Sequence, residues 1–325
     1  MRRALAWGVV AAAAVMSGSA FAQDWPTRPL TMIVPFAAGG GVDTTARSIT
    51  PRLAETLGQQ IVVENVGGSG GMIGGARVAK AAPDGYTFMM GSAGTHAINQ
   101  SLYKKPLYNS ATDFTAAGIA AHSFFILIAR KDFPANTLPE FVAYAKANGA
   151  KMQYASAGAG SSTHVACLIL NAAIGASITH IPYRGTAMAI QDLMAGRIDY
   201  ICEPISTALA QVRGGNVKAV VNLGPARTPV LPDLATAAEQ GLPDATMTSW
   251  TGFFFPKGTP APIVKRFSQA LHDALETPAV RTRLQGLGLA PAAPQERTPE
   301  FAAKFIPAEI EKWGKPIRAA GLSAD

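Results

Sequence analysis

The sequence predicts an α/β protein that folds into two lobes, and three observations lead to this expectation. Its 325 residues, 48% of them hydrophobic and 15% charged, suffice for about two globular domains. Short apolar runs typical of buried parallel strands alternate with segments of helical periodicity, which is the pattern of βαβ units. The alternation restarts near residue 124, so we expect a second α/β lobe from that point.

The first lobe is expected to open with a strand at Leu30–Phe36, a nearly continuous apolar run. Further strands are predicted at residues 61–63 and 86–90. The segment after the first strand has helical spacing, with Asp43 placed as its N-cap. Pro51 lies inside this helix, so we expect it to kink or split the helix.

The second lobe is expected to begin with the apolar strand Phe124–Arg130. A later apolar strand at Trp250–Phe255 comes too far along the chain to extend the second sheet. We therefore assign residues 23–123 and 248–325 to lobe 1 and residues 124–247 to lobe 2, with a ligand cleft between them. Other elements of lobe 2 are expected at Leu138–Asn148 (a helix), Met152–Ser156, Ile178–Tyr183, Ile198–Cys202 and Val217–Asn222.

The first 22 residues have the three parts of an export signal. Two arginines precede the apolar run Ala4–Met16, and Ala20 and Ala22 occupy the small-residue positions before a cleavage point. The apolar run is too short for a membrane-spanning helix. The sequence therefore predicts a signal peptide over residues 1–22 and a periplasmic mature protein.

Several classes of function are disfavoured by composition and spacing. The net charge of +7 is spread along the chain without a basic block, which argues against nucleic-acid binding. The glycine-rich segments match neither the dinucleotide nor the phosphate-loop pattern, and the histidines lack zinc-protease spacing. We expect no metal and no cofactor. Cys167 and Cys202, in an oxidising compartment, form either a disulfide or two separate buried thiols.

Two glycine-rich loops carry the expectation of a binding site. Residues 37–41 follow the first strand and precede a helix, and residues 155–163 repeat this arrangement with added hydroxyl groups. In open α/β sheets, ligands bind beyond the carboxyl ends of strands, where helix N-termini present free N–H groups. Two such loops facing one cleft predict a site that holds a carboxylate from both sides. Each loop alone equally suits a tight turn, and Gly67–Gly75 is expected to be a mobile surface turn.

The sequence gives little support for an enzyme. A secreted hydrolase would use Ser92 or Ser156, but Ser156 lies outside any Gly-x-Ser-x-Gly motif. Ser92 and His96 share one loop, and they are more simply explained as groups that line the cleft. We expect no catalytic residues. Arg184 ends a strand at the same edge as the Ser156 loop, so it either contacts a ligand carboxylate or forms an ion pair.

A series of short motifs covers essentially the whole mature chain, in the order found in one receptor family. They are Val34–Gly40 with Asp43 and Arg47, Val63–Asn65, Ala81–Thr87, Tyr154–Ser161 with His164, His180–Gly185, Leu231–Asp233, Glu239–Pro243, Trp250–Gly252 and Pro256–Pro260. Together these motifs resemble the Bug family, the TctC-like periplasmic receptors of tripartite tricarboxylate transporters. The chain departs from the pattern at Gln100, where a proline is usual, and at Cys202 and Glu203, where apolar residues are commoner.

The resemblance implies the Venus-flytrap fold of type II periplasmic binding proteins, with a doubly wound, mainly parallel sheet in each lobe and helices on both faces. It also implies a monomer that captures a small carboxylate (an aliphatic di- or tricarboxylate, a carboxylated aromatic or an amino acid) and delivers it to membrane permease subunits. Docking on a sensor kinase or chemoreceptor is the alternative role. Glu203 near the cleft would disfavour an anion, so we expect it to tune ligand choice or act through a water. The ligand-binding residues implied are Phe36, Ala38, Gly39, Gly40, Asp43, Ser92, Thr95, His96, Ser156, Gly158, Gly160, Ser161, Tyr183, Arg184 and Asp199.

Overall fold

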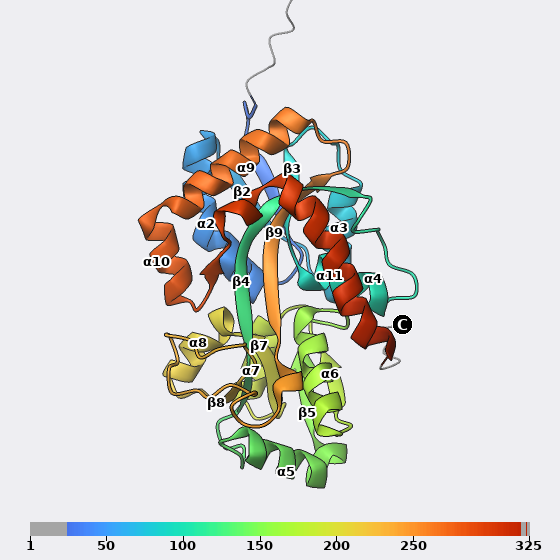
Figure 1. The fold of residues 1–325 in the computed structure, drawn as a ribbon, viewed down its shortest axis with the longest axis vertical. Coiled ribbons are helices and arrows are strands. Elements are labelled where there is room, and N and C mark those ends of the chain that lie inside the picture. Colours follow the sequence, from blue (N-terminus) through green and yellow to red (C-terminus); the bar gives the residue numbers. More distant parts are fainter. Residues whose placement is uncertain (1–24, 320–322, 324–325) are drawn as a thin grey trace, which may run out of the picture.

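The computed structural model describes residues 25–319 and 323, so the expected signal peptide lies outside the described residues. The molecule has two lobes stacked along its long axis, and β4 lies beside β9 over its first part before it continues into the lower lobe (Figure 1). The two-lobed α/β fold expected from the sequence is confirmed.

The upper lobe in Figure 1 is built on strands in the order β2-β1-β3-β9-β4. The first three are parallel, whereas β9 is antiparallel to both β3 and β4. Its elements are β1 (Leu30–Val34), α2 (Gly41–Leu57), β2 (Ile61–Asn65), η1 (Ser69–Gly71), α3 (Met72–Ala79), β3 (Thr87–Ser92), η2 (Gly94–Ile98), α4 (Asn99–Leu102), β9 (Thr248–Pro256), α9 (Ala261–Glu276), α10 (Pro278–Gly286), β10 (Ala290–Pro291), η5 (Pro294–Arg297) and α11 (Pro299–Ala319).

The lower lobe has the parallel strands β6, β5 and β7, and β7 and β8 each pair antiparallel with β4. Both sheets therefore combine a parallel part with antiparallel crossing strands. The elements are β4 (Phe114–Arg130), α5 (Leu138–Asn148), η3 (Gly149–Lys151), β5 (Gln153–Ser156), α6 (Ser162–Ile174), β6 (Thr179–Pro182), α7 (Thr186–Met194), β7 (Tyr200–Pro204), α8 (Ile205–Arg213), β8 (Val217–Asn222) and η4 (Pro243–Ala245).

Strand β4 connects the lobes by changing its partner. Its first part pairs with β9 as far as Phe124, which lies opposite Thr248. From Phe125, which lies opposite Pro204, it pairs with β7. Because successive side chains of a strand face opposite sides, Leu127 packs in the core under α5 and α6, whereas its neighbour Ile128 packs under α7 and α8.

Helices cover both faces of the upper sheet by the same alternation. Met32 and Val34 of β1 belong to a core that includes Ile49 of α2 and Phe267 of α9. Ile33, between them in sequence, belongs to the core on the other face, under α3 and α11. The apolar run Leu30–Val34 is therefore a strand buried on both faces.

Helix α2 differs from the expectation at two positions. It continues without a break through Pro51. Proline has no N–H, so Pro51 donates no hydrogen bond to the carbonyl of Arg47, one turn earlier. Because Pro51 is exposed, this carbonyl lies on the solvent side, where water can hydrate it. Asp43 is not the N-cap, because the helix begins at Gly41 and Asp43 lies within its first turn.

The glycine cluster Gly67–Gly75 is not a surface turn. Gly70, Gly71 and Gly74 are buried, and a Cβ on Gly70 would collide with the carbonyl oxygen of Ala159 from the other lobe. The absence of side chains at this position lets the two lobes touch. The expectation missed this contact because the two loops are distant in sequence.

Cys167 of α6 and Cys202 of β7 lie side by side in the lower core, and both are buried free thiols. The backbone N–H of Cys202 donates to Cys167 Sγ over 3.0 Å. Over the described part of the chain, no helix has the length and apolarity needed to cross a membrane.

Candidate functional site

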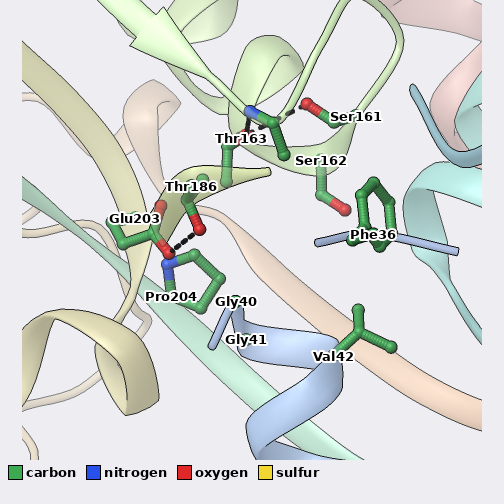
Figure 2. A pocket seen from close by; sticks show the side chains of 11 residues that line it. Phe36, Gly40, Gly41, Val42, Ser161, Ser162, Thr163, Thr186, Glu203 and Pro204 are labelled. Atoms are coloured by element: carbon green, nitrogen blue, oxygen red, sulfur yellow. Dashed lines mark hydrogen bonds between the residues drawn. The ribbon is translucent and has the colours of Figure 1, made fainter. Parts of the chain in front are cut away.

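A cavity of about 40 Å³ lies between the lobes, and Figure 2 shows the side chains around it. The upper lobe contributes Phe36 and the start of α2, and the lower lobe contributes the remainder. Because both lobes form its wall, a molecule held here bridges them. The lining residues are Phe36, Gly40, Gly41, Val42, Ala157, Ser161, Ser162, Thr163, Thr186, Glu203 and Pro204.

Four helices begin at this cavity. Gly41 is the first residue of α2, Ser162 of α6 and Thr186 of α7, and Pro204 is the N-cap of α8. The first N–H groups of a helix have no partner within it, and the helix dipole places partial positive charge there. Among the residues that the structure describes, no Lys, Arg or His lines the cavity. Backbone groups alone therefore make this site favourable for an anion.

The first loop is fixed by Asp43. Its carboxylate accepts hydrogen bonds from Gly39 N (2.9 Å), Asn65 Nδ2 (2.9 Å) and Arg47 Nε (2.9 Å). Burial opposes ionisation of Asp43, but the hydrogen bonds from these three groups outweigh it and lower the pKa. Because the N–H of Gly39 is engaged within the protein and Gly39 and Ala38 are exposed, the loop presents Gly40 to the cavity.

The second loop is likewise held by its own side chains. Ser161 caps α6: its hydroxyl donates to Gly158 O (2.7 Å) and accepts from His164 N (3.3 Å). Gly158 N donates to Ser156 Oγ and Gly160 N donates to His164 Nδ1. The N–H groups of both glycines are therefore occupied, and Ser161 is the expected residue of this loop that reaches the cavity.

Ser156 and His180 form a buried serine–histidine contact. Ser156 Oγ lies 2.7 Å from His180 Nε2. Burial lowers the pKa of His180 to about 4, so the ring is neutral near pH 7 and shares one hydrogen bond with the serine hydroxyl. Ser156 is fully buried, and no carboxylate of the described residues hydrogen-bonds His180. The contact anchors the loop and lacks the exposed nucleophile of a hydrolase.

The three binding residues expected in the loop after β3 lie in two different places. Ser92 lines a second cavity, whereas Thr95 and His96 are fully buried in the upper lobe. The His96 ring stacks on Phe254 with centroids 3.6 Å apart, and burial lowers the pKa of His96 to about 3. His96 is thus a neutral core residue.

Tyr183, Arg184 and Asp199 do not line the cavity. The Tyr183 hydroxyl donates to Asp192 Oδ2 (2.7 Å), and Arg184 is exposed. Asp199 precedes β7, so it lies at the amino end of that strand and accepts from Arg130 Nε (3.1 Å). The cavity is at the carboxyl end of the same strand, and the expected position of Asp199 in the cleft is therefore not met.

The sequence reasoning missed the first turns of the helices that follow the loops. It reached Phe36, Gly40 and Ser161, but it stopped before the first residues of the helices, whose N–H groups have no partner within the helix. A signal was present, since the first residues after a strand-to-helix loop are those with unsatisfied N–H groups. The missed lining residues are Gly41, Val42, Ala157, Ser162, Thr163, Thr186 and Pro204, together with Glu203, which was noted only as a departure.

The second cavity, also about 40 Å³, shares Gly41, Val42, Ser162 and Pro204 with the first and lies beside the paired strands β4 and β9. Three buried hydroxyls there have no hydrogen-bond partner within the described chain: Ser92 Oγ, Ser206 Oγ and Thr251 Oγ1. Hydroxyl groups both donate and accept, so this end of the site suits water or a polar ligand atom. The described residues contain no cluster of three or more groups able to hold a metal ion.

Known proteins of one family are similar to this chain over most of its length. Residues 45–322 match the model of the TctC family, described as the tripartite tricarboxylate transporter family receptor. The structure of MatC (Rpa3494) from Rhodopseudomonas palustris with bound malate is 42% identical, with a TM-score of 0.87 over 90% of this chain and 99% of that chain.

Two further solved structures are similar over nearly their whole length. The periplasmic binding protein BugD is 37% identical, with a TM-score of 0.89 over 92% of this chain and 99% of that chain. R. palustris Rpa4515 with adipate is 31% identical, with a TM-score of 0.87 over 92% and 99%. With a family model matched over most of its length, the chain belongs to the TctC family of periplasmic receptors of tripartite tricarboxylate transporters.

Proposed function

We propose that this protein captures a small carboxylate in the cavity between its lobes and delivers it to the permease subunits of a tripartite tricarboxylate-type transporter. The observation that carries the proposal is the meeting of four helix N-termini at a cavity with no cationic side chain among the described residues. Free N–H groups and aligned dipoles bind an anion without a charged partner. The malate and adipate bound by two relatives support the choice of a carboxylate.

Capture works by lobe closure. A ligand that contacts both lobes binds the closed form more tightly and shifts the equilibrium towards it. Interlobe hydrogen bonds in this structure, from Tyr103 Oη to Ala159 O (2.6 Å) and from Ala37 N to Arg184 O (3.3 Å), fit a closed form. We infer that residues 23–123 with 248–325 form one rigid lobe and residues 124–247 the other. The hinge then lies where β4 changes partner.

Membership of the TctC family also supports a proposal about where the protein acts. We infer that residues 1–22 are removed as a signal peptide and that the mature chain acts in the periplasm as a monomer without a cofactor. We propose that its role is binding and that it has no catalytic activity, because the Ser156–His180 contact is buried and has no access to a substrate.

Gly40→Val tests the site. Gly40 has φ −78° and ψ 172°, which any residue adopts, and a Cβ there would lie 3.6 Å from Thr186 Oγ1. The added methyl groups enter the space of the anion with little backbone strain, so we expect at least about tenfold weaker binding and stability within about 1 kcal/mol of wild type.

The measurement is calorimetric titration of residues 23–325 with L-malate, succinate, adipate, citrate and L-aspartate. Gly286→Val is the matched control, since Gly286 lies on an exposed helix end with no atom within 4 Å of an added Cβ. No binding by wild type across the panel contradicts the proposed function. Unchanged affinity of Gly40→Val moves the site elsewhere.

A further inference from the structure

Glu203 is a carboxyl group in a cavity built for an anion. It is fully buried at the end of β7 and lines the cavity. Oε1 accepts a hydrogen bond from Thr186 Oγ1 (2.8 Å), shown as a dashed line in Figure 2. Oε2 makes no hydrogen bond within the described chain, and the neighbouring hydroxyl of Thr207 is also buried without one. A buried oxygen without a partner costs stability, so a bound molecule that satisfies it gains affinity.

We propose that Glu203 is the specificity-determining residue of this site and that it binds the ligand as a neutral carboxylic acid, donating its proton in a hydrogen bond to the ligand's carboxylate. This inference rests on the proposed function. It makes capture of the anion depend on a proton held by the protein. The competing arrangement, an ionised Glu203 paired with an ammonium group of the ligand, gives the opposite pH dependence.

The surroundings of Glu203 favour the neutral form. Burial raises its pKa to about 8, against smaller opposing effects of the hydroxyls of Thr186 and Thr207. The group is therefore mostly protonated at pH 7 before any ligand binds. An incoming anion disfavours the ionised form further. A neutral acid also removes the repulsion that a carboxylate at this position would cause.

The charged and titratable groups on the helices and strands around Glu203 do not supply a counter-ion for its carboxylate. Strand β7 packs against β4, β5, α6, α7 and α8, and α2 faces Glu203 across the cavity. The groups on these elements hydrogen-bond or stack elsewhere: Arg130 with Asp199, His122 with Glu296, Tyr154 on His180, His164 with Gly160, Cys167 with Cys202, Asp192 with Arg197, Arg213 with Val230, and Asp43 with Arg47. None of them is a cause of the pKa shift of Glu203.

The first test is the pH dependence of binding, measured with L-malate and adipate by calorimetry between pH 6 and 9.5. If only the protonated form binds, the affinity is constant below about pH 8 and falls about tenfold per pH unit above it. Proton uptake then approaches one per ligand at pH 9. Affinity that rises with pH, or proton release on binding, overturns the proposal.

Variants separate this role from simple packing. In Glu203→Gln the amide N–H₂ can donate in place of the acid, so we expect binding within about fivefold of wild type at pH 7 and no dependence on pH up to 9.5. Thr186→Val removes a hydrogen bond that favours ionisation, so the fall in affinity should begin at a higher pH. Glu300→Gln, on the exposed start of α11, is the control and should match wild type.

A second readout needs no ligand. Infrared difference spectra of wild type against Glu203→Gln at pH 7 should show the carbonyl band of a protonated carboxylic acid, and its absence overturns the proposal. Failure of every acid of the panel to bind at any pH contradicts the proposed function. Binding with a pH-independent affinity contradicts only the role of Glu203. With L-aspartate as the probe, loss of binding in Glu203→Gln together with wild-type affinity that rises with pH assigns an ammonium-bearing ligand instead.

Discussion

Replacing Asp43 with Asn should loosen the loop that presents Gly40 to the cavity. The carboxylate holds three donors at 2.9 Å: Gly39 N, Asn65 Nδ2 and Arg47 Nε. Asn keeps the shape and one acceptor oxygen, so it can still serve Asn65. Its amide group, however, turns a donor towards the remaining donors.

The expected magnitude follows from what is lost. A hydrogen bond to a charged group contributes about 1.5–3 kcal/mol, and the pair with Arg47, whose side chain is 49% exposed, adds at most about 1 kcal/mol. We expect Asp43→Asn to lower the free energy of unfolding by about 2–4 kcal/mol. Because the loop must then be ordered on binding, affinity for a carboxylate should fall by about tenfold or more.

The pH dependence of this difference has a definite sign. The pKa of Asp43 is lowered in the folded state, so its contribution is fully present above the unfolded pKa, near the ordinary 3.8. It disappears as the pH falls through the lower folded value. Wild type and Asp43→Asn should therefore differ at pH 7 and converge in strong acid.

The assay is urea unfolding followed by circular dichroism, together with calorimetric titration against the best binder of the panel. Asp273→Asn is the control, because the exposed Asp273 carboxylate accepts a comparable hydrogen bond from Gln269 (2.9 Å). We expect this control to stay within about 0.5 kcal/mol of wild type. If Asp43→Asn unfolds and binds as wild type does, the loop is not held by Asp43.

Two further predictions concern the histidines and the contact between the lobes. Burial lowers the pKa values of His96 and His164 to about 3 and of His180 to about 4, so the unfolded chain binds more protons below pH 6.5. The free energy of unfolding should therefore fall as the pH drops from 6.5 to 4.5, by up to about 1.4 kcal/mol per pH unit for each ring, and the melting temperature should fall with it. A constant melting temperature over this range would contradict their burial. Gly70→Ala should hinder closure because its Cβ meets Ala159 O, so small-angle scattering with saturating ligand should give a larger radius of gyration than wild type, whereas equal radii would place the contact elsewhere.

The sequence was informative where local patterns decide the structure. The helix Leu138–Asn148 and the strand Val217–Asn222 have the bounds that periodicity predicts, because caps and apolar spacing act over a few residues. The return of the chain to the first sheet at Trp250–Phe255 was also predictable, since β9 is too late in the chain to belong to the second sheet.

Long-range contacts decided the positions that could not be predicted. Whether the N–H of Gly39 is free depends on where the carboxylate of Asp43 points, and sequence spacing does not show this. The burial of Gly70 depends on a loop of the other lobe. Asp199 is a different case, because its place at the start of a strand already assigned it to the end away from the cleft.

A crystal structure of residues 23–325 grown with L-malate tests the central claim most directly. We predict a ligand carboxylate within about 3 Å of backbone nitrogens at the starts of α2 and α6, with no Lys or Arg side chain in contact. A malate bound outside this cavity, or held by an arginine side chain, would contradict the account.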